Sequence, residues 1–102
     1  MIIITGHILP RPETLDDTVA LCTSHSLRSR AEPGCIAHNV HVDCEDPGRL
    51  VFLEVWADRA AVMHHFAVPE SGQFVKTITA LAAAPPVMTL YSADELPSPF
   101  TR

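Results

Sequence analysis

Two apolar runs separated by a turn sequence constrain this chain more than any other feature. The runs "CIAHNVHVDC" (35–44) and "RLVFLEVWA" (49–57) flank "EDPG", which is typical of tight turns. Runs of this length that are rich in β-branched and aromatic residues predict strands. Because the connection is so short, the two strands must pair with each other as an antiparallel hairpin over residues 35–57.

Centring the turn on Asp46 and Pro47 predicts which side chains of the hairpin share a face. One face is then mainly aliphatic, with His38, Val40, Val42, Val51, Leu53 and Val55. The other face combines aromatic rings with hydrogen-bonding groups, from Asn39, His41, Phe52, Glu54 and Trp56. A shift of one residue in the pairing would exchange the faces of one strand relative to the other.

A strand and a helix are predicted before the hairpin. Residues 2–9 are rich in isoleucine and predict the first strand. Thr14 is a suitable N-cap for the helix that follows, and Asp17 stands at capping-box spacing from it. Pro33 and Gly34 end this helix, since neither continues a helical backbone well.

A second helical region and a last strand are predicted after the hairpin. Asp58 is a suitable N-cap for a helix that Pro69 interrupts, and residues 71–84 resume the helical pattern. Residues 85–93, "PPVMTLYSA", predict an edge strand with its prolines confined to the start. Residues 94–102 show no periodicity and are expected to form a tail.

The order β-α-β-β-α-β predicts an α+β, ferredoxin-like fold, with an antiparallel sheet and both helical regions on one face. A chain of 102 residues leaves no room for a second core, so we expect one domain over residues 1–93. Large apolar residues lie on both faces of the predicted sheet, yet helices cover only one. We therefore expect a homodimer that buries the open face, sheet against sheet.

Charge and composition exclude several classes of function. Seven Lys and Arg residues against twelve Asp and Glu give a net charge of -5, which disfavours nucleic acid as a partner. The first ten residues lack a basic segment and a long apolar run, so we expect a cytoplasmic protein that does not bind membranes. Cys22, Cys35 and Cys44 contain no CxxC pair and are each interpreted as small buried hydrophobes.

Three segments resemble the antibiotic biosynthesis monooxygenase (ABM) domain family of dimeric α/β barrels: "AEPGCIAHNVHVD", "DPGRLVFLEVWADRAAVMHHF" and "PPVMTLYS". The most specific motifs are "EPGC" at 32–35, Glu54-x-Trp56 and His65, and the resemblance extends over residues 1–93. It implies a homodimer with a pocket between each sheet and its helices. It also implies oxidation of a small quinol- or anthrone-like aromatic by O₂ without a metal or flavin cofactor.

The resemblance and the residues together suggest a site on one face of the hairpin. If Glu54 and Trp56 face the helices, the turn into the next helix brings His65 over the same surface. Trp56 and Phe52 would form flat apolar walls, and Glu54, Asn39 and His41 would supply directed polar contacts.

Each of these residues has an expected role. We expect His65 to act as the general base that deprotonates the substrate, and Glu54 to orient its imidazole. Asn39 and Trp56 are expected to contact the substrate. His64 lies about 100° away around the helix and is expected to face solvent. The chain departs from the family pattern at His38, Asn39 and His64, which alters the expected polarity of the pocket.

Other functions stay open at this point. A metal site is not expected, because His38 and His41 have opposite parity along their strand and no facial triad is apparent. Haem is not expected either, because the first strand offers Gly6 and His7 where haem-binding proteins of this fold need an amide. A non-catalytic, ligand-binding dimer and an isomerase-type relative on the same fold are the alternatives to a monooxygenase.

Overall fold

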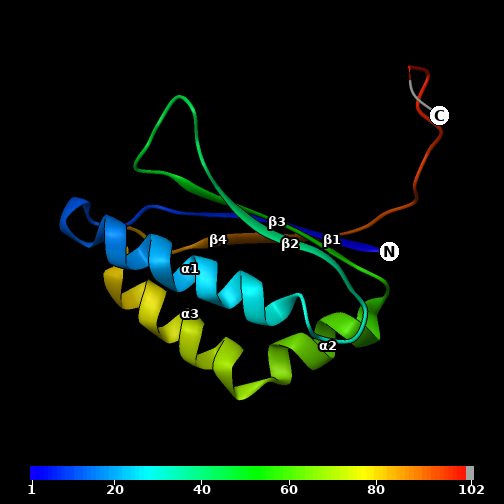
Figure 1. The fold of residues 1–102 in the computed structure, drawn as a ribbon, viewed down its shortest axis with the longest axis horizontal. Helices are drawn as coiled ribbons and strands as arrows, with labels where there is room; N and C mark the ends of the chain where they lie inside the picture. The colour runs from blue at the N-terminus through cyan, green and yellow to red at the C-terminus, as the bar shows by residue number, and fades with distance from the viewer. Residues whose placement is uncertain (101–102) are drawn as a thin grey trace.

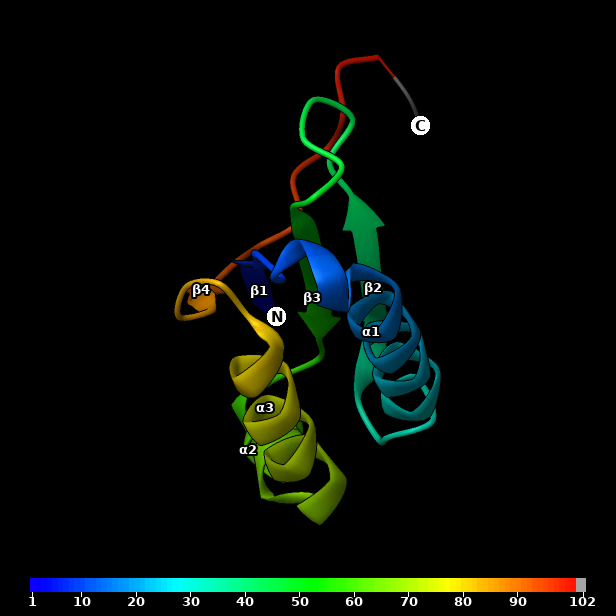
Figure 2. The ribbon, with the colours of Figure 1, turned by 90° about the vertical axis from the view of Figure 1, so that its left-hand side faces the viewer.

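The computed structural model describes residues 1–100, in which four strands form one antiparallel sheet. The strands, in the spatial order β2-β3-β1-β4, are β1 (Ile2–Ile8), β2 (Cys35–Val42), β3 (Leu50–Trp56) and β4 (Val87–Ser92). The helices are the 3-10 turn η1 (Pro12–Thr14), α1 (Leu15–Ser29), α2 (Arg59–Ala67) and α3 (Pro69–Leu81). The helices lie on the same side of the sheet (Figures 1 and 2). The predicted ferredoxin-like α+β fold is confirmed.

The hairpin of β2 and β3 pairs one residue away from the predicted register. His38 lies opposite Glu54, so these two side chains face the helices together. Asn39 lies opposite Leu53 and His41 lies opposite Val51, on the other face of the sheet. The prediction that Asn39 and His41 share a surface with Glu54 is therefore wrong.

Two aspartates in the connecting loop account for this register. The Oδ1 atom of Asp43 accepts the backbone N–H of Glu45 at 2.8 Å, and Oδ1 of Asp46 accepts that of Gly48 at 3.0 Å. Such side-chain turns compete with a simple four-residue turn. Asp43 also pairs with Arg49 through a backbone hydrogen bond of 3.0 Å and an ion pair of 3.0 Å. The connection is thus one residue longer than "EDPG", which shifts every pair in the hairpin.

Of the two predicted helix caps, the structure contains the one at Asp58 but not the one at Thr14. The Thr14 hydroxyl lies 2.9 Å from the carbonyl of Arg11 and 2.8 Å from that of Leu81, and it does not cap α1. The helix is instead preceded directly by the 3-10 turn η1, so the predicted capping box is wrong. Asp58 does cap α2, because its Oδ1 atom accepts the backbone N–H of Ala61 at 2.9 Å.

Gly34 brings the turn between α1 and β2 against α2. Among residues 1–100 it alone has a positive φ, 80°, a conformation that only glycine adopts without cost. Its carbonyl accepts the backbone N–H of Ala57 at 2.8 Å. A Cβ atom added to it would lie 2.5 Å from the Cβ of Ala61. Both the backbone and the packing therefore require glycine here.

The Gly34→Ala substitution is expected to lower the free energy of unfolding by about 2 kcal/mol or more, from left-handed strain plus the clash with α2. Gly72→Ala is the matched control, since a Cβ at Gly72 in α3 meets nothing within 4 Å. The control is expected to raise the free energy of unfolding by about 0.5 to 1 kcal/mol. Urea denaturation followed by Trp56 fluorescence measures both. Equal destabilisation by the two changes would contradict this account.

The core consists of two apolar clusters beneath the helices. One contains Ile8, Cys22, Leu50, Phe52 and Ile78, and the other contains Ile2, Ile4, Trp56 and Val62. Several polar side chains are also buried under the helices, namely His25, Ser26, Ser29, His38, Glu54 and His65. Burying polar groups costs free energy, so this set of side chains is the first place to look for a functional site.

Three further predictions concern the cysteines, the C-terminal tail and membrane-spanning helices. Cys22 is buried as predicted, but Cys35 is only half-buried, and Cys44 is exposed because it lies in the loop after β2. Residues 93–100 contain no helix or strand and extend away from the sheet (Figure 1). Positions 101 and 102 of the predicted tail lie outside the described residues. Within the described part of the chain, no helix has the length and apolar character needed to cross a membrane.

Candidate functional site

A cavity of about 280 Å³ lies between the sheet and the helices α2 and α3. Most of its wall is apolar, with Ile4, Ile8, Phe52, Phe66, Phe74 and Ile78 among the residues that line it. Polar side chains also reach the cavity, from His25, Glu54, His65 and Ser71. An apolar enclosure with a few directed polar groups is typical of sites for small organic ligands.

The Glu54 carboxylate is buried and held by one donor. The indole Nε1–H of Trp56 donates to its Oε1 atom at 3.0 Å. Burial raises the pKa of Glu54 to about 7, with a further contribution from the negative charge of Glu32. This carboxyl group therefore holds its proton more strongly than an exposed glutamate does.

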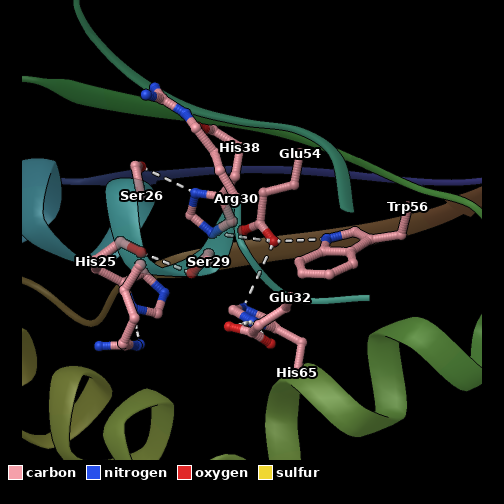
Figure 3. Close-up of polar contacts among 10 residues, drawn as sticks. His25, Ser26, Ser29, Arg30, Glu32, His38, Glu54, Trp56 and His65 are labelled. Carbon is pink, nitrogen blue, oxygen red and sulfur yellow. Dashed lines mark hydrogen bonds and ion pairs between the residues drawn. The ribbon is translucent and has the colours of Figure 1, made fainter. Parts of the chain in front are cut away.

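His65 lies between two carboxylates, as Figure 3 shows. Its Nδ1 atom is 3.0 Å from Oε1 of Glu32, and its Nε2 atom is 3.9 Å from Oε1 of Glu54. A carboxylate can only accept, so Nδ1 carries the proton and Nε2 keeps its lone pair. Burial lowers the pKa of His65, and the Glu32 carboxylate opposes that shift. The arrangement presents a neutral, oriented imidazole.

Two further histidines pack against His65. Burial lowers the pKa of His25 and of His38 to about 3, so both are neutral at pH 7. Ser26 Oγ lies 2.9 Å from Nδ1 of His38, and the Arg28 guanidinium donates to Nδ1 of His25 at 2.6 Å. One ring nitrogen from each of the three histidines lies within 4.8 Å of the others. The convergence of these three rings, which come from three different elements, was not predicted from the sequence.

The structure separates the predicted site residues into two groups. Glu54, Phe52 and His65 line the cavity together. Trp56 has no exposed surface and is not among the residues that line it; its role in the structure is to bind Glu54 rather than to face the cavity. The predicted contact between Trp56 and a substrate therefore has no basis in this geometry.

The remaining predicted residues lie away from the cavity. Asn39 is on the open face of the sheet, where its Oδ1 atom accepts from Arg30 Nη2 at 2.8 Å. His41 is on the same open face and is exposed. His64 is exposed on α2, as predicted from its angular separation from His65.

Sequence reasoning missed three residues of this site: Glu32, His25 and Ser71. Glu32 belongs to the "EPGC" motif, but its contact with His65 bridges 33 positions of the chain. His25 follows Thr18 and Cys22 at helical spacing, so the buried stripe of α1 was the signal that could have located it. Ser71 has a buried hydroxyl with no hydrogen-bond partner among residues 1–100.

The sheet, its one helical layer and the cavity between them define a ferredoxin-like α+β protein. The sequence profile of the family described as antibiotic biosynthesis monooxygenase matches residues 1–77. The chain belongs to this family, and the resemblance of its motifs is confirmed.

Individual relatives agree with this assignment. The crystal structure of an antibiotic biosynthesis monooxygenase is 32% identical, with a TM-score of 0.84 over 93% of this chain and 100% of that one. A structure from Deinococcus radiodurans is 26% identical, with a TM-score of 0.91 over 96% of this chain and 97% of the other. An uncharacterized protein from Synechocystis sp. is 33% identical over 94 residues, which are 92% of this chain but 64% of that longer relative.

Proposed function

We propose that this protein uses O₂ to oxidise a small, electron-rich aromatic compound of the quinol or anthrone type. The observation that supports this most directly is the position of His65. Its Nε2 atom lies 3.9 Å from Oε1 of Glu54, both residues line an apolar cavity, and Glu32 binds the opposite ring nitrogen. An oriented neutral imidazole beside an apolar cavity is suited to removing a proton from a weak organic acid.

The first step is proton transfer. A phenolic hydroxyl, or the acidic C–H group of an anthrone, gives its proton to His65 Nε2. The Glu32 carboxylate stabilises the imidazolium that forms, because it accepts the Nδ1–H bond in both charge states. Oε1 of Glu54 lies 3.9 Å from the same nitrogen, so a small side-chain rotation would let it bind the proton in turn and return His65 to its neutral form.

The second step transfers electrons to O₂. The deprotonated aromatic gives one electron to O₂ readily, whereas the neutral compound does so poorly, and the two radicals combine to form a peroxide at carbon. For an anthrone the peroxide then loses water, so one oxygen atom enters the product as a carbonyl and the other leaves as H₂O. The four electrons that reduce O₂ come from the CH₂ group that becomes C=O. The apolar wall of the cavity, including Phe52 and Phe74, limits side reactions of these intermediates with water.

Oxygen uptake with a panel of hydroquinones and anthrones tests this function. We expect turnover with at least one member and no dependence on added flavin. An anthrone should give the anthraquinone and water, whereas a hydroquinone, which supplies only two electrons, should give its quinone and H₂O₂. Saturable binding without oxygen uptake would instead identify a ligand-binding protein, and isomerised product without oxygen uptake would identify an isomerase.

We also infer that the functional unit is a homodimer joined through the open face of the sheet. Leu53 is 42% exposed and Tyr91 is 53% exposed on that face, and every residue of β4 is exposed. A monomer with these residues in water would present an apolar patch over the centre and edge of its sheet.

Sedimentation at micromolar concentration should give twice the chain mass of 11.1 kDa. Leu53→Asp should shift the protein to monomer, since a symmetric interface would bury the new charge twice. Leu27→Asp on α1 is the control, because Leu27 is 60% exposed on the helical side and should leave the mass unchanged. A monomeric wild-type protein would disprove the dimer.

A further inference from the structure

We propose that His25, His38 and His65 form a binding site for one divalent transition-metal ion. The three side chains come from α1, β2 and α2 and are all buried. Their ring centroids are separated by 5.0, 5.4 and 5.5 Å, and one ring nitrogen of each lies within 4.8 Å of the others. Nothing in the reaction proposed above requires His25 or His38.

The outer contacts of two histidines resemble those of metal ligands. A ligating histidine usually binds a carboxylate or another polar group with its remote nitrogen. His65 does so with Glu32 at 3.0 Å, and His38 does so with Ser26 at 2.9 Å, both through Nδ1. The His38 side chain is completely buried, yet its Nε2 atom makes no hydrogen bond within the described residues. A bound ion would satisfy this nitrogen.

Glu54 supplies a fourth donor. Its Oε1 atom lies 3.4 Å from Nε2 of His38 and 3.9 Å from Nε2 of His65. Three nitrogens within 4.8 Å of one another surround a point no more than roughly 2.8 Å from each, at most about 0.7 Å longer than a Zn–N bond, so small side-chain rotations complete the shell. Imidazole nitrogens with one carboxylate favour Zn²⁺, Fe²⁺ and similar ions over Mg²⁺ or Ca²⁺.

Arg28 opposes metal binding and so provides a specific test. A guanidinium can only donate, so its 2.6 Å contact places the proton of His25 on Nε2. Coordination through that nitrogen requires the proton to move to Nδ1, which breaks the bond to Arg28. Removing the guanidinium should therefore strengthen metal binding. If Arg28 only supported the fold, its removal would not strengthen binding.

The ion and the proposed oxidation compete for one lone pair. His65 Nε2 cannot accept a proton from a substrate while it binds a metal ion. Occupancy of the site should therefore suppress oxygen uptake, and the chelator-treated protein should be the active form. The two proposals can fail independently, because metal binding is measured without a substrate and oxidation is measured without a metal.

The test is a titration of chelator-treated protein with Co²⁺, followed by its visible absorption and by displacement with Zn²⁺. We expect one equivalent to bind, with no competition from Mg²⁺. His25→Gln and His38→Gln should each weaken binding by more than about 100-fold, because loss of an outer partner alone costs 10- to 100-fold. His64→Gln, next to His65 but exposed, is the matched control and should bind like wild type.

Arg28→Met should bind Co²⁺ about 10-fold more tightly, because no charged hydrogen bond then has to break, and a misfolded variant could not show this gain. Far-UV circular dichroism verifies that the two glutamine variants are folded. Absence of a stoichiometric Co²⁺ spectrum would overturn the proposal. Binding that survives in the folded His38→Gln protein, or that is lost in His64→Gln, would overturn it as well.

Discussion

Replacing His65 with alanine is expected to lower kcat for oxygen uptake by about 100- to 10,000-fold, the usual contribution of a general base. The imidazole is the proposed base at the cavity wall; Glu32 does not line the cavity, and the Glu54 carboxylate is held by the Trp56 indole. The measurement is steady-state oxygen consumption with the best substrate from the panel, at saturating concentration.

Two controls separate catalysis from folding in this experiment. His64→Ala removes the adjacent, exposed imidazole and should keep wild-type kcat. Added imidazole should partly restore turnover to His65→Ala, which no structural defect would allow. Glu32→Gln should lower kcat by about 10- to 100-fold while KM changes little, as expected for a positioning residue. A His65→Ala protein with full turnover would exclude the proposed base.

Replacing Trp56 with alanine is expected to lower the free energy of unfolding by about 3 to 5 kcal/mol, because a fully buried indole leaves a large cavity. The same change removes the N–H donor of Glu54, which then lies buried without it. Since total stability is about 5 to 15 kcal/mol, this substitution should bring the protein close to unfolding at room temperature.

The matched variant for this prediction is Trp56→Phe. It keeps most of the buried ring and loses only the Nε1–H bond to Glu54, so we expect a cost of about 1 to 2 kcal/mol. Trp56 is the single tryptophan, and unfolding must therefore be followed by far-UV circular dichroism in urea. A Trp56→Ala protein that loses less than 1 kcal/mol would show that the indole does not support the core.

The sequence was sufficient to predict the order of elements, because strand and helix patterns here are separated by turn residues and by Pro69. It was also sufficient to place Glu54 and His65 near each other, since only two residues separate the end of β3 from the start of α2. These are local relations along the chain. For the same reason Asp58 was correctly identified as a helix cap.

The rest of the site depends on relations that a local pattern does not contain. The register of the hairpin follows from how Asp43 and Asp46 fold the loop, and it exchanged Asn39 for His38 on the cavity side. The contact between Glu32 and His65 requires two distant turns to meet. His25 belongs to a helix whose rotation about its axis is fixed by packing.

The length of the loop between β2 and β3 determines which side chains of β2 face the helices, and this affects how the sites of such proteins can diverge. It lies far from the cavity, at the surface, where lengths change without harm to a fold. Yet a deletion of one residue there would turn β2 over, so that Asn39 and His41 enter the interior while His38 leaves it. A single change in loop length could thus exchange every inward-facing side chain of β2 at once. Point substitutions would have to change the same side chains one by one.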